Sequence, residues 1–362
     1  MRSRRCSLVL GGGGIRGLAH VGVLAALEEH HLVPSEVIGS SVGAMIGAAW
    51  CAGVASEELR QLAIQIERDD LFRLAHADMA LRRLLSPAIY QQEPLADFVR
   101  GLLGTMTFDD LDRRLLVNTV DVNSGAQVFW GSPGLRDVPV ADAVIASCSM
   151  PGFLPPHRIG SRYFVDGAAA ANLPVHPASR PDRDLVIAVD VSARARPGRA
   201  VHRLGFAAVF ARGIELGVQR MDDIALRTWT KPPLLLIRPA VWHVDLLSFR
   251  HNAELVDAGY QATHAVLDAP HALPAPNATG VYPRRRVRVE ILRERCVGRG
   301  ACVLAGPPGQ FRMDDDGKAV VTDPTPVWSP VDGYCVTQCP TSAIAALDLE
   351  PGIGVPIPAQ PA

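Results

Sequence analysis

Ser41 is the residue of this sequence best placed to act as a nucleophile. It lies at the centre of Gly39-Ser40-Ser41-Val42-Gly43, the Gly-x-Ser-x-Gly pattern that puts a serine on a sharp turn between a strand and a helix. The flanking glycines let that turn close, and the positive end of the following helix favours negative charge on the serine oxygen. A serine also needs a base before it can attack a carbonyl carbon, so the chemistry depends on a second residue.

Asp166 is the strongest candidate for that base. It ends an apolar stretch, Tyr163-Phe164-Val165, that is typical of a strand, and Gly167-Ala168 follows, so the carboxylate falls at a strand end. Among the histidines, His20 lies on an apolar helical face and favours a core position, while His157 follows two prolines and stays an alternative. No motif adjoins His176, His243 or His251. Because an Asp-Gly pair is usually only a turn, Asp166 depends on the other motifs for support.

A glycine-rich segment that precedes the serine motif has two interpretations. Residues 12–17 (Gly-Gly-Gly-Ile-Arg-Gly) fit Gly-x-Gly-x-x-Gly between a predicted strand and a predicted helix, the pattern of a dinucleotide site. That fingerprint also needs a carboxylate about 20 residues further on to bind a ribose, and the chain has Gly39-Ser40-Ser41 there instead. The favoured interpretation is an oxyanion hole, in which glycine amides converge on a developing negative charge.

The predicted elements around these residues alternate between strands and helices. A buried strand at 6–10 leads to an amphipathic helix at 17–31, and a short strand at 37–38 leads to a small-residue helix that ends near Gly53. This alternation indicates an α/β domain with a mostly parallel central sheet. Further strands are predicted at 115–122, 127–130, 163–165, 184–191 and 234–237, and further helices at 142–147, 203–228 and 245–268. The segment 57–104 is predicted to be mostly helical, as a peripheral layer rather than a lid or membrane-touching helix.

Length and composition narrow the class of protein. The 362 residues are too many for one ordinary core, so two domains are expected, and 48% hydrophobic with 20% charged residues is typical of a globular protein. A formal net charge of -1 provides no electrostatic basis for binding nucleic acid. The sequence has no run of about 18 apolar residues. Four glycines also interrupt the apolar stretch that follows the arginines at 2, 4 and 5, so the prediction is a cytoplasmic protein, free or peripheral at the membrane.

Four motifs, taken in order, resemble those of the patatin-like phospholipase family. They are 12–17, 39–43, the segment 146–156 (Ala-Ser-Cys-Ser-Met-Pro-Gly-Phe-Leu-Pro-Pro) and 166–168 (Asp-Gly-Ala), and the resemblance covers about residues 5–268. It implies a three-layer α/β domain and a Ser–Asp dyad without histidine, with Ser41 as nucleophile and Asp166 as base. Substrates in the family are acyl esters of lipids, and the hydrolase needs no cofactor. The resemblance also implies an oxyanion hole built from the amides of Gly12, Gly13 and Gly14, with Arg16 shaping the loop.

The last part of the chain contains four of the seven cysteines, Cys296, Cys302, Cys335 and Cys339. In a cytosolic protein such clustering indicates metal binding more than disulfides. A zinc site is one interpretation, but it favours cysteines separated by two to four residues, whereas five residues separate Cys296 from Cys302. A terminal Cys-Pro pair, here Cys339-Pro340, suits an iron–sulfur cluster better.

Residues 284–349 resemble a small bacterial single-cluster ferredoxin, an α+β domain. In that family two cysteines and a later Cys-Pro hold the cluster, and the residue midway between the first two is a cysteine in 4Fe-4S members and another residue in 3Fe-4S members. Arg299 stands midway here, so the resemblance implies a 3Fe-4S cluster on Cys296, Cys302 and Cys339. Cys335 is either a core residue, which is the favoured interpretation, or the fourth ligand of a 4Fe-4S cluster.

These resemblances divide the chain into four parts. They are a hydrolase domain at 5–268, a linker at 269–283, a ferredoxin-like domain at 284–349 and a disordered tail at 350–362. The predicted function is a phospholipase A or lysophospholipase-like acyl-ester hydrolase with an electron-transfer domain. Two alternatives stay open: an electron carrier whose hydrolase fold is a lipid-binding or docking module, and a thioesterase or general esterase. The expected partners are a lipid or acyl-ester substrate, a membrane surface, and a redox partner such as a ferredoxin reductase or a monooxygenase.

Overall fold

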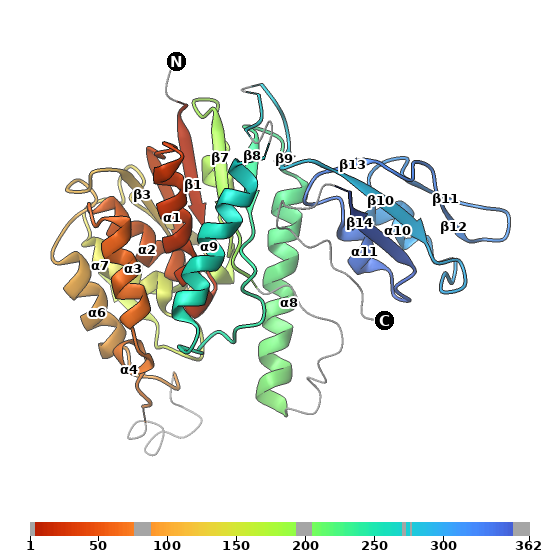
Figure 1. The fold of residues 1–362 in the computed structure, drawn as a ribbon. Coiled ribbons are helices and arrows are strands. Elements are labelled where there is room, and N and C mark those ends of the chain that lie inside the picture. The colour runs from red at the N-terminus through yellow and green to blue at the C-terminus, as the bar shows by residue number, and fades with distance from the viewer. Residues whose placement is uncertain (1–3, 76–87, 193–204, 270–272, 276, 350–362) are drawn as a thin grey trace.

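The computed structural model of the chain describes residues 4–75, 88–192, 205–269, 273–275 and 277–349 (Figure 1). A large sheet with its helices makes up most of the molecule, and a smaller unit follows towards the carboxyl end (Figure 1). The predicted tail at 350–362 lies outside the described residues, as does the middle of the segment 57–104. Within the described residues, no helix combines the length and the apolar character needed to cross a bilayer.

A nine-stranded mixed sheet forms the centre of the large unit. Its strand order is β5-β6-β3-β2-β1-β7-β8-β9, and β4 pairs with β3 outside this path. All pairs from β3 through to β9 are parallel, while β4, β5 and β6 pair antiparallel. The sheet is therefore parallel at its centre, as predicted, and antiparallel at one edge. The strands are β1 (Cys6–Leu10), β2 (Glu36–Ser40), β3 (Arg114–Asp121), β4 (Gln127–Trp130), β5 (His157–Ile159), β6 (Arg162–Asp166), β7 (Leu185–Val189), β8 (Leu234–Ile237) and β9 (Val281–Tyr282).

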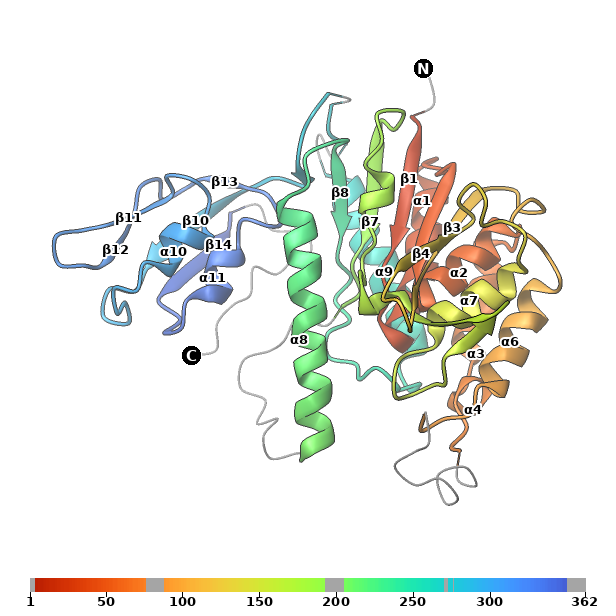
Figure 2. The ribbon, with the colours of Figure 1, turned by 180° about the vertical axis from the view of Figure 1, so that it is seen from behind.

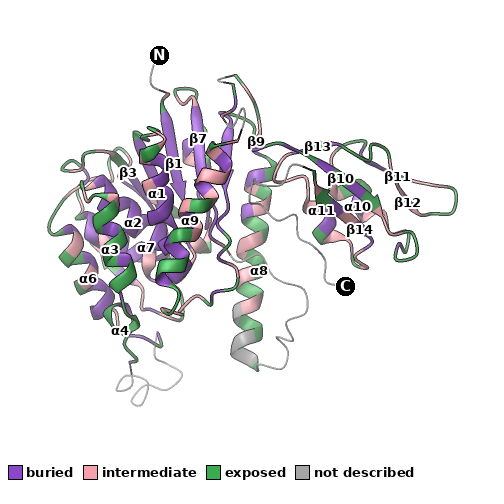
Figure 3. Cartoon of the chain, viewed as in Figure 1, coloured by how far each residue is buried: buried purple, intermediate pink, exposed green. Residues whose placement is uncertain are grey.

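Helices cover the two faces of this sheet unequally (Figures 1 and 2). One face carries a thick helical layer, whose apolar side chains share a core with Leu8 and Leu10 of β1. The layer consists of α1 (Ala19–Glu29), α2 (Val42–Cys51), α3 (Ser56–Gln65), α4 (Arg68–Leu71), α6 (Glu93–Leu103), α7 (Val140–Cys148) and α9 (Asn252–Leu267). On the other face, Val9 packs in a smaller core with η4 (His176–Ala178) and the end of α8 (Phe206–Arg227). Because successive strand residues point to opposite faces, the fully buried run of β1 contributes to both cores (Figure 3).

The strand register brings the carboxyl ends of β1 and β2 level with the end of β6. Gly39 of β2 pairs with Leu10 of β1, and the next residue, Ser40, pairs with Asn118 of β3. Thr119 of β3 then pairs with Asp166, the last residue of the antiparallel strand β6. Ser41 and Asp166, far apart in sequence, therefore leave the sheet at the same level.

Two predicted boundaries differ from the structure for a physical reason. The helix predicted at 245–268 begins only at Asn252, because the preceding segment bonds to the glycine loop, with the Ile15 amide donating to the Leu246 carbonyl over 3.0 Å. The linker predicted at 269–283 contains β9, which extends the large sheet by pairing with β8. The large unit therefore continues to Tyr282, and the apolar pair Val281-Tyr282 serves as an edge strand.

The segment 57–104 is less continuous than predicted. It contains α3, the single turn α4 and α6, and between the last two Leu74 and Tyr90 form an isolated antiparallel bridge. The aromatic ring of Tyr90 packs against those of Phe72 and Phe153, so this segment is part of the helical layer on the main core. The described part of the segment therefore packs on the main core through its buried apolar side chains.

The carboxyl-terminal unit has its own small core. A three-stranded sheet of order β13-β10-β14 and a hairpin of β11 and β12 enclose Val287, Val289, Phe311 and Trp328. In β10 buried and exposed residues alternate, as expected of a strand with one solvated face. The elements are β10 (Arg285–Ile291), α10 (Ala301–Ala305), β11 (Phe311–Met313), β12 (Ala319–Val321), β13 (Val327–Trp328), α11 (Tyr334–Gln338) and β14 (Ile344–Asp348). The unit therefore contains both strands and short helices.

Helix α8 stands between the large sheet and the carboxyl-terminal unit (Figure 1). Its Arg220 hydrogen-bonds to the Tyr334 hydroxyl and, over 2.9 Å, to the Gln338 side chain of α11. The Arg227 guanidinium lies 4.3 Å from the centre of the Tyr334 ring, a cation–π contact. The two units therefore meet through arginines of α8 and one tyrosine of α11.

Candidate active site

Ser41 occupies a strained turn at the carboxyl edge of the sheet. Its backbone angles are φ 55° and ψ −130°, a region that costs a non-glycine residue about 1–3 kcal/mol. Both glycines of the motif are needed for close approach. A Cβ on Gly39 would lie 2.5 Å from the Ala44 Cα, and one on Gly43 would lie 2.4 Å from the Leu10 carbonyl oxygen. The packed strand and helix thus hold the serine in a conformation that it would not adopt in isolation.

Ser147 fixes the backbone of this turn from the neighbouring helix α7. The Ser41 amide donates to the Ser147 oxygen over 2.8 Å, and the Ser147 hydroxyl donates to the Asn118 carbonyl over 2.7 Å. Ser147 is fully buried. The sequence placed it in the third motif without assigning it a role, since a serine inside a helix carries no signal of what it faces.

Asp166 lies beside Ser41, as the strand register requires. Burial raises the pKa of the Asp166 carboxyl to about 6, against the lowering effect of hydrogen bonds from the Ala168 amide and the Ser41 side chain. The Ala168 amide donates over 2.8 Å. The structure therefore brings the two residues of the predicted dyad together, with a carboxylate whose proton affinity suits a base near neutral pH.

The glycine loop lies against Ser41 but does not offer all the amides that the sequence predicted. A Cβ on Gly12 would be 3.1 Å from the Ser41 Cβ, so the loop passes directly over the serine. The Gly12 amide, however, already donates to the Asn172 carbonyl over 3.1 Å. Within the described residues, the amides of Gly13 and Gly14 donate to no protein acceptor. The predicted oxyanion donors therefore reduce to Gly13 and Gly14, and Gly12 anchors the loop.

Arg16 is buried and holds the far side of the same loop. Its Nε donates to the Val244 carbonyl over 2.6 Å, next to the bond between the Ile15 amide and the Leu246 carbonyl. The Arg16 guanidinium thus fastens the glycine loop to the segment before α9.

Two buried groups behind the loop were missed by the sequence analysis. Asn172 accepts from Gly12 with its backbone carbonyl, and its side chain donates to Asp222 of α8 over 3.4 Å. Asp222 also accepts from the Leu173 amide over 2.9 Å, and burial raises its pKa to about 7. These contacts tie the glycine loop to α8 through residues more than 150 positions away, which no local motif could indicate.

The histidines considered as bases have other partners. His20 is buried and its Nε2 donates to the Gly11 carbonyl over 2.8 Å, while burial lowers its pKa to about 4, so it is a neutral core residue supporting the loop. His157 bonds to Asp142 over 3.2 Å. The core interpretation of His20 was correct, and His157 contacts Asp142 instead of Ser41.

Replacing Ser147 with alanine should lower kcat for ester hydrolysis on the order of 10²-fold with little change in KM, because the turn that aims Ser41 loses its support. The unpaired Ser41 amide and Asn118 carbonyl should also lower the free energy of unfolding by about 1–3 kcal/mol. Steady-state kinetics and urea unfolding measure both effects. Ser149→Ala is the matched control, since the buried Ser149 hydroxyl donates to Ile145 instead. Equal losses of kcat in both variants would contradict a positioning role.

The cysteines predicted to bind metal are grouped in the carboxyl-terminal unit. Cys296, Cys302 and Cys339 line one cavity together with the loop that contains Arg299. The Ala319 amide donates to the Cys296 sulfur over 3.4 Å, and the Ala343 amide donates to the Cys339 sulfur over 3.2 Å. Cys335 is fully buried outside that cavity, and its thiol donates to the Asp332 carbonyl over 3.4 Å.

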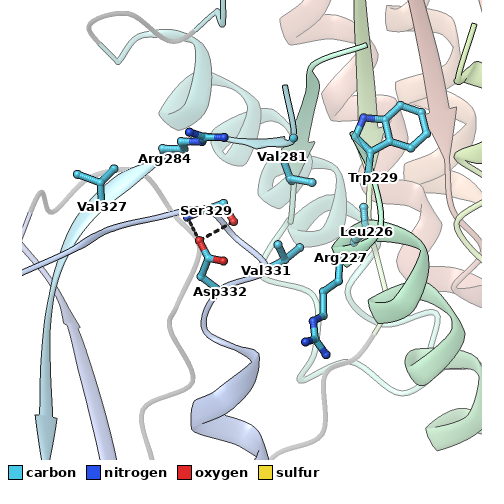
Figure 4. Close-up of a pocket in the computed structure, with 10 residues that line it drawn as sticks. Leu226, Arg227, Trp229, Val281, Arg284, Val327, Ser329, Val331 and Asp332 are labelled. Atoms are coloured by element: carbon cyan, nitrogen blue, oxygen red, sulfur yellow. Dashed lines mark hydrogen bonds between the residues drawn. The ribbon is translucent and has the colours of Figure 1, made fainter. Parts of the chain in front are cut away.

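A larger cavity of about 290 Å³ lies at the junction of the two units (Figure 4). The end of α8 contributes Leu226 and Arg227, and the carboxyl-terminal unit contributes Ser329 and Asp332, which hydrogen-bond to each other. Neither Ser41 nor Asp166 lines it. This cavity belongs to the contact between the units and not to the candidate dyad.

Comparison with known proteins identifies the large unit. Residues 8–179 match the family described as patatin-like phospholipase. An uncharacterized NTE family protein of Mycobacterium tuberculosis is 31% identical over 198 residues, covering 54% of this chain and 52% of that protein. A cGAMP-activated phospholipase of Escherichia coli is 28% identical over 188 residues, covering 46% of this chain and 52% of that protein. Residues 8–179 thus match the patatin-like phospholipase family, and the chain spans about half the length of these curated relatives.

A solved structure resembles the chain more loosely. The crystal structure of VipD from Legionella pneumophila has a TM-score of 0.44 at 14% sequence identity, covering 74% of this chain and 67% of that one. At this similarity no residue role can be transferred. The predicted patatin-like α/β domain is confirmed by the family match, while the roles of individual residues depend on the geometry described above.

Proposed function

We propose that the chain is a serine hydrolase that cleaves carboxylic esters of lipids, with Ser41 as nucleophile and Asp166 as base. The observation that carries this proposal is the position of Ser41 beside the buried carboxyl group of Asp166, whose pKa is about 6. A dyad of this kind can accept a proton at neutral pH. The patatin-like phospholipase domain at 8–179 supports a lipid ester as the substrate class.

The reaction proceeds in two balanced steps. The Ser41 oxygen attacks the ester carbonyl carbon while its proton passes to the Asp166 carboxylate, and the tetrahedral oxyanion accepts hydrogen bonds from the Gly13 and Gly14 amides. Asp166 then returns the proton to the leaving alcohol, which leaves an acyl-serine. A water molecule gives its proton to Asp166 as it attacks that acyl group. Asp166 then passes the proton to the Ser41 oxygen as the bond between that oxygen and the acyl carbon breaks, which releases the acid and regenerates the enzyme. One oxyanion donor is typically worth about 2.7–4 kcal/mol to the transition state.

Exposed apolar side chains on α8 support a lipid surface as the source of substrate. Phe210, Ile214 and Ile224 are 59%, 52% and 61% exposed, and such residues in one helix favour contact with a membrane interface. The test is ester turnover with fluorophosphonate labelling mapped to Ser41. The same fatty-acyl ester should turn over faster in vesicles than as a monomer. Thioester substrates in the panel decide between a phospholipase and a thioesterase, and absence of labelling at Ser41 would end the proposal.

For the carboxyl-terminal unit we propose an iron–sulfur cluster held by Cys296, Cys302 and Cys339. The fit is supported by three thiols around one cavity and by amide donors to two of the sulfurs. The bond from the Ala319 amide lowers the pKa of Cys296, which favours the thiolate that a metal requires. The buried place of Cys335 outside the cavity supports a three-ligand cluster. Such a cluster supplies one-electron transfer when bound, so a redox protein is the partner that this unit would need.

Protein purified without oxygen should contain about three irons per chain and be brown, as expected of a 3Fe-4S centre. Cys302→Ser should lose the iron and the visible absorption, because it removes one of three ligands. Cys335→Ser is the matched control and should keep both. If the protein is colourless and contains zinc, the cysteines form a zinc site and not an iron–sulfur cluster. Loss of iron from the Cys335 variant would contradict the assignment of three ligands.

A further inference from the structure

Helices α1 and α9 lie side by side and end together at the edge of the sheet away from Ser41 (Figure 1). Helix α1 runs from the glycine loop back to the beginning of β2, so its carboxyl end lies where the parallel strands start. The two backbones are in direct contact, since a Cβ on Gly259 would lie 1.8 Å from the Ala19 carbonyl oxygen. This packing fixes the distance between side chains at the carboxyl ends of the two helices.

Three side chains converge at these ends. His30 follows the last residue of α1, His264 lies in the last turn of α9, and Asp268 follows that helix. The His30 Nε2 is 3.2 Å from the His264 Nδ1 and 3.4 Å from one Asp268 carboxylate oxygen, and the His264 Nδ1 is 3.2 Å from the other. Two nitrogens and a carboxylate thus form a compact triangle of potential ligands.

The edges of this triangle match a tetrahedral metal site. Zinc binds histidine nitrogen at 2.0–2.1 Å, so that ligands on a regular tetrahedron stand about 3.3–3.4 Å apart. The two imidazole nitrogens, 3.2 Å apart, lie close to this value, and each is 3.2–3.4 Å from a different oxygen of the Asp268 carboxylate. Without a cation, the nitrogens of His30 and His264 and the oxygens of Asp268 can satisfy one another only by sharing protons. A single bound cation would accept a lone pair from each of the three side chains.

The contacts around His264 also favour binding of a metal ion. Its Nε2 lies 3.2 Å from a Glu29 carboxylate oxygen, which also accepts the Tyr260 hydroxyl over 2.8 Å. A proton on Nε2 directs the Nδ1 lone pair of His264 into the triangle, the arrangement by which a carboxylate orients a metal-binding histidine. The carboxyl ends of both helices also carry negative partial charge, which favours a cation.

We propose that His30, His264 and Asp268 bind a divalent transition-metal ion, Zn²⁺ above all, with solvent as the fourth ligand. Two imidazoles with one carboxylate suit zinc and its neighbours, while Mg²⁺ and Ca²⁺ prefer oxygen ligands only. The side chains of His30 and His264 are 23% and 25% exposed, so an ion can reach them from solvent. The ion would fasten α1 to α9 far from the dyad, so it stabilises the fold and takes no part in ester hydrolysis.

A second group of histidines provides an internal comparison. His243 and His251 each bond to Glu254, over 2.6 Å and 2.9 Å, but on different carboxylate oxygens. Their ring centres are 6.2 Å apart. These are two separate ion pairs with no common centre, and among the described residues the compact grouping of ligand atoms is found at His30, His264 and Asp268.

Calorimetric titration of chelator-treated full-length protein with Zn²⁺ tests the proposal. The wild type should bind one Zn²⁺ more than His264→Ala or Asp268→Asn. All three proteins have the same cysteines, so the difference in Zn²⁺ stoichiometry excludes any zinc that the cysteines bind. Glu29→Gln should weaken this binding about 10–100-fold, the usual effect of losing an orienting carboxylate. His251→Ala should match the wild type. Zn²⁺ should also raise Tm more in the wild type and in His251→Ala than in His264→Ala or Asp268→Asn.

Co²⁺ gives an independent spectroscopic readout of the ligands. At this site it should give visible ligand-field bands without sulfur-to-metal charge transfer, and these bands should disappear in His264→Ala and Asp268→Asn. Asp268 is exposed, so its variant tests the site even if His264→Ala fails to fold. Equal Zn²⁺ stoichiometry and affinity in the wild type and Asp268→Asn, or Co²⁺ bands unchanged by that substitution, would overturn the proposal.

Discussion

Replacing Ser41 with alanine should reduce ester hydrolysis on the order of 10⁶-fold, the loss expected when the nucleophile of a serine hydrolase is removed. The variant should stay folded. Its amide still donates to Ser147, and alanine takes over the same backbone strain at φ 55°. Initial rates with a fatty-acyl ester and a thermal unfolding curve on the same preparation measure both expectations.

The neighbouring serine provides the control for this experiment. Ser40 is fully buried in β2, and its hydroxyl oxygen accepts a hydrogen bond from the Asn118 side chain over 3.5 Å. Ser40→Ala should therefore keep activity and lose a little stability. Turnover near the wild-type rate in purified Ser41→Ala would exclude the covalent mechanism, and equal loss in the two variants would indicate damage to the turn instead.

Asp166→Asn should lower kcat/KM on the order of 10⁴-fold, the upper range for loss of a general base. In the wild type, kcat/KM should fall about tenfold per pH unit below pH 6 and level off above it, because the carboxyl has a pKa of about 6 and acts only when ionised. Activity remaining in the asparagine variant should lack this transition. A pH profile of the variant with the same inflection would assign the transition to another group.

The same substitution should change stability in the opposite direction to activity. Because burial raises the Asp166 pKa above the ordinary value of 3.8, the folded protein holds the proton more tightly than the unfolded chain. Wild-type stability therefore declines as pH rises from about 4 to 6, and asparagine removes this loss. The variant should have the higher Tm at about pH 8, with a smaller difference at about pH 5.

Asp121 serves as a control of opposite sign. It lies at the end of β3, and hydrogen bonds from the Ser124 and Asn123 amides lower its pKa. Its carboxylate therefore stabilises the fold above the ordinary pKa of the side chain. Asp121→Asn should lower Tm near neutral pH and leave the pH profile of hydrolysis unchanged. If both aspartate variants shift Tm in the same direction, the buried charge of Asp166 is not the cause.

The proposed metal site and the proposed hydrolase can fail separately. The dyad is at the carboxyl edge of the parallel strands, whereas His30, His264 and Asp268 lie at the opposite edge. Loss of Zn²⁺ binding should thus lower Tm and leave kcat unchanged, and Ser41→Ala should abolish turnover and leave Zn²⁺ binding unchanged. The proposed metal site therefore affects stability at one edge of the sheet, and the proposed dyad carries out catalysis at the other.

Local sequence determined the elements that carry the chemistry. The strands at 6–10, 127–130 and 234–237 have the predicted bounds, because a short apolar run between turn residues favours a strand wherever it is buried. The turn at Ser41 could be recognised from five residues, although Gly43 is needed because Leu10 of β1 approaches it closely. Features that depend on neighbours in the chain could therefore be predicted from the sequence.

Tertiary structure alone decided which groups are available and which are occupied. The Gly12 amide is taken by Asn172, Ser41 is fixed by Ser147, and β9 joins the sheet from within a predicted linker. His30 and His264 are 234 residues apart and meet only because α1 and α9 pack together. Such contacts depend on how whole elements pack and on strand register. Neither can be predicted from a short stretch of sequence.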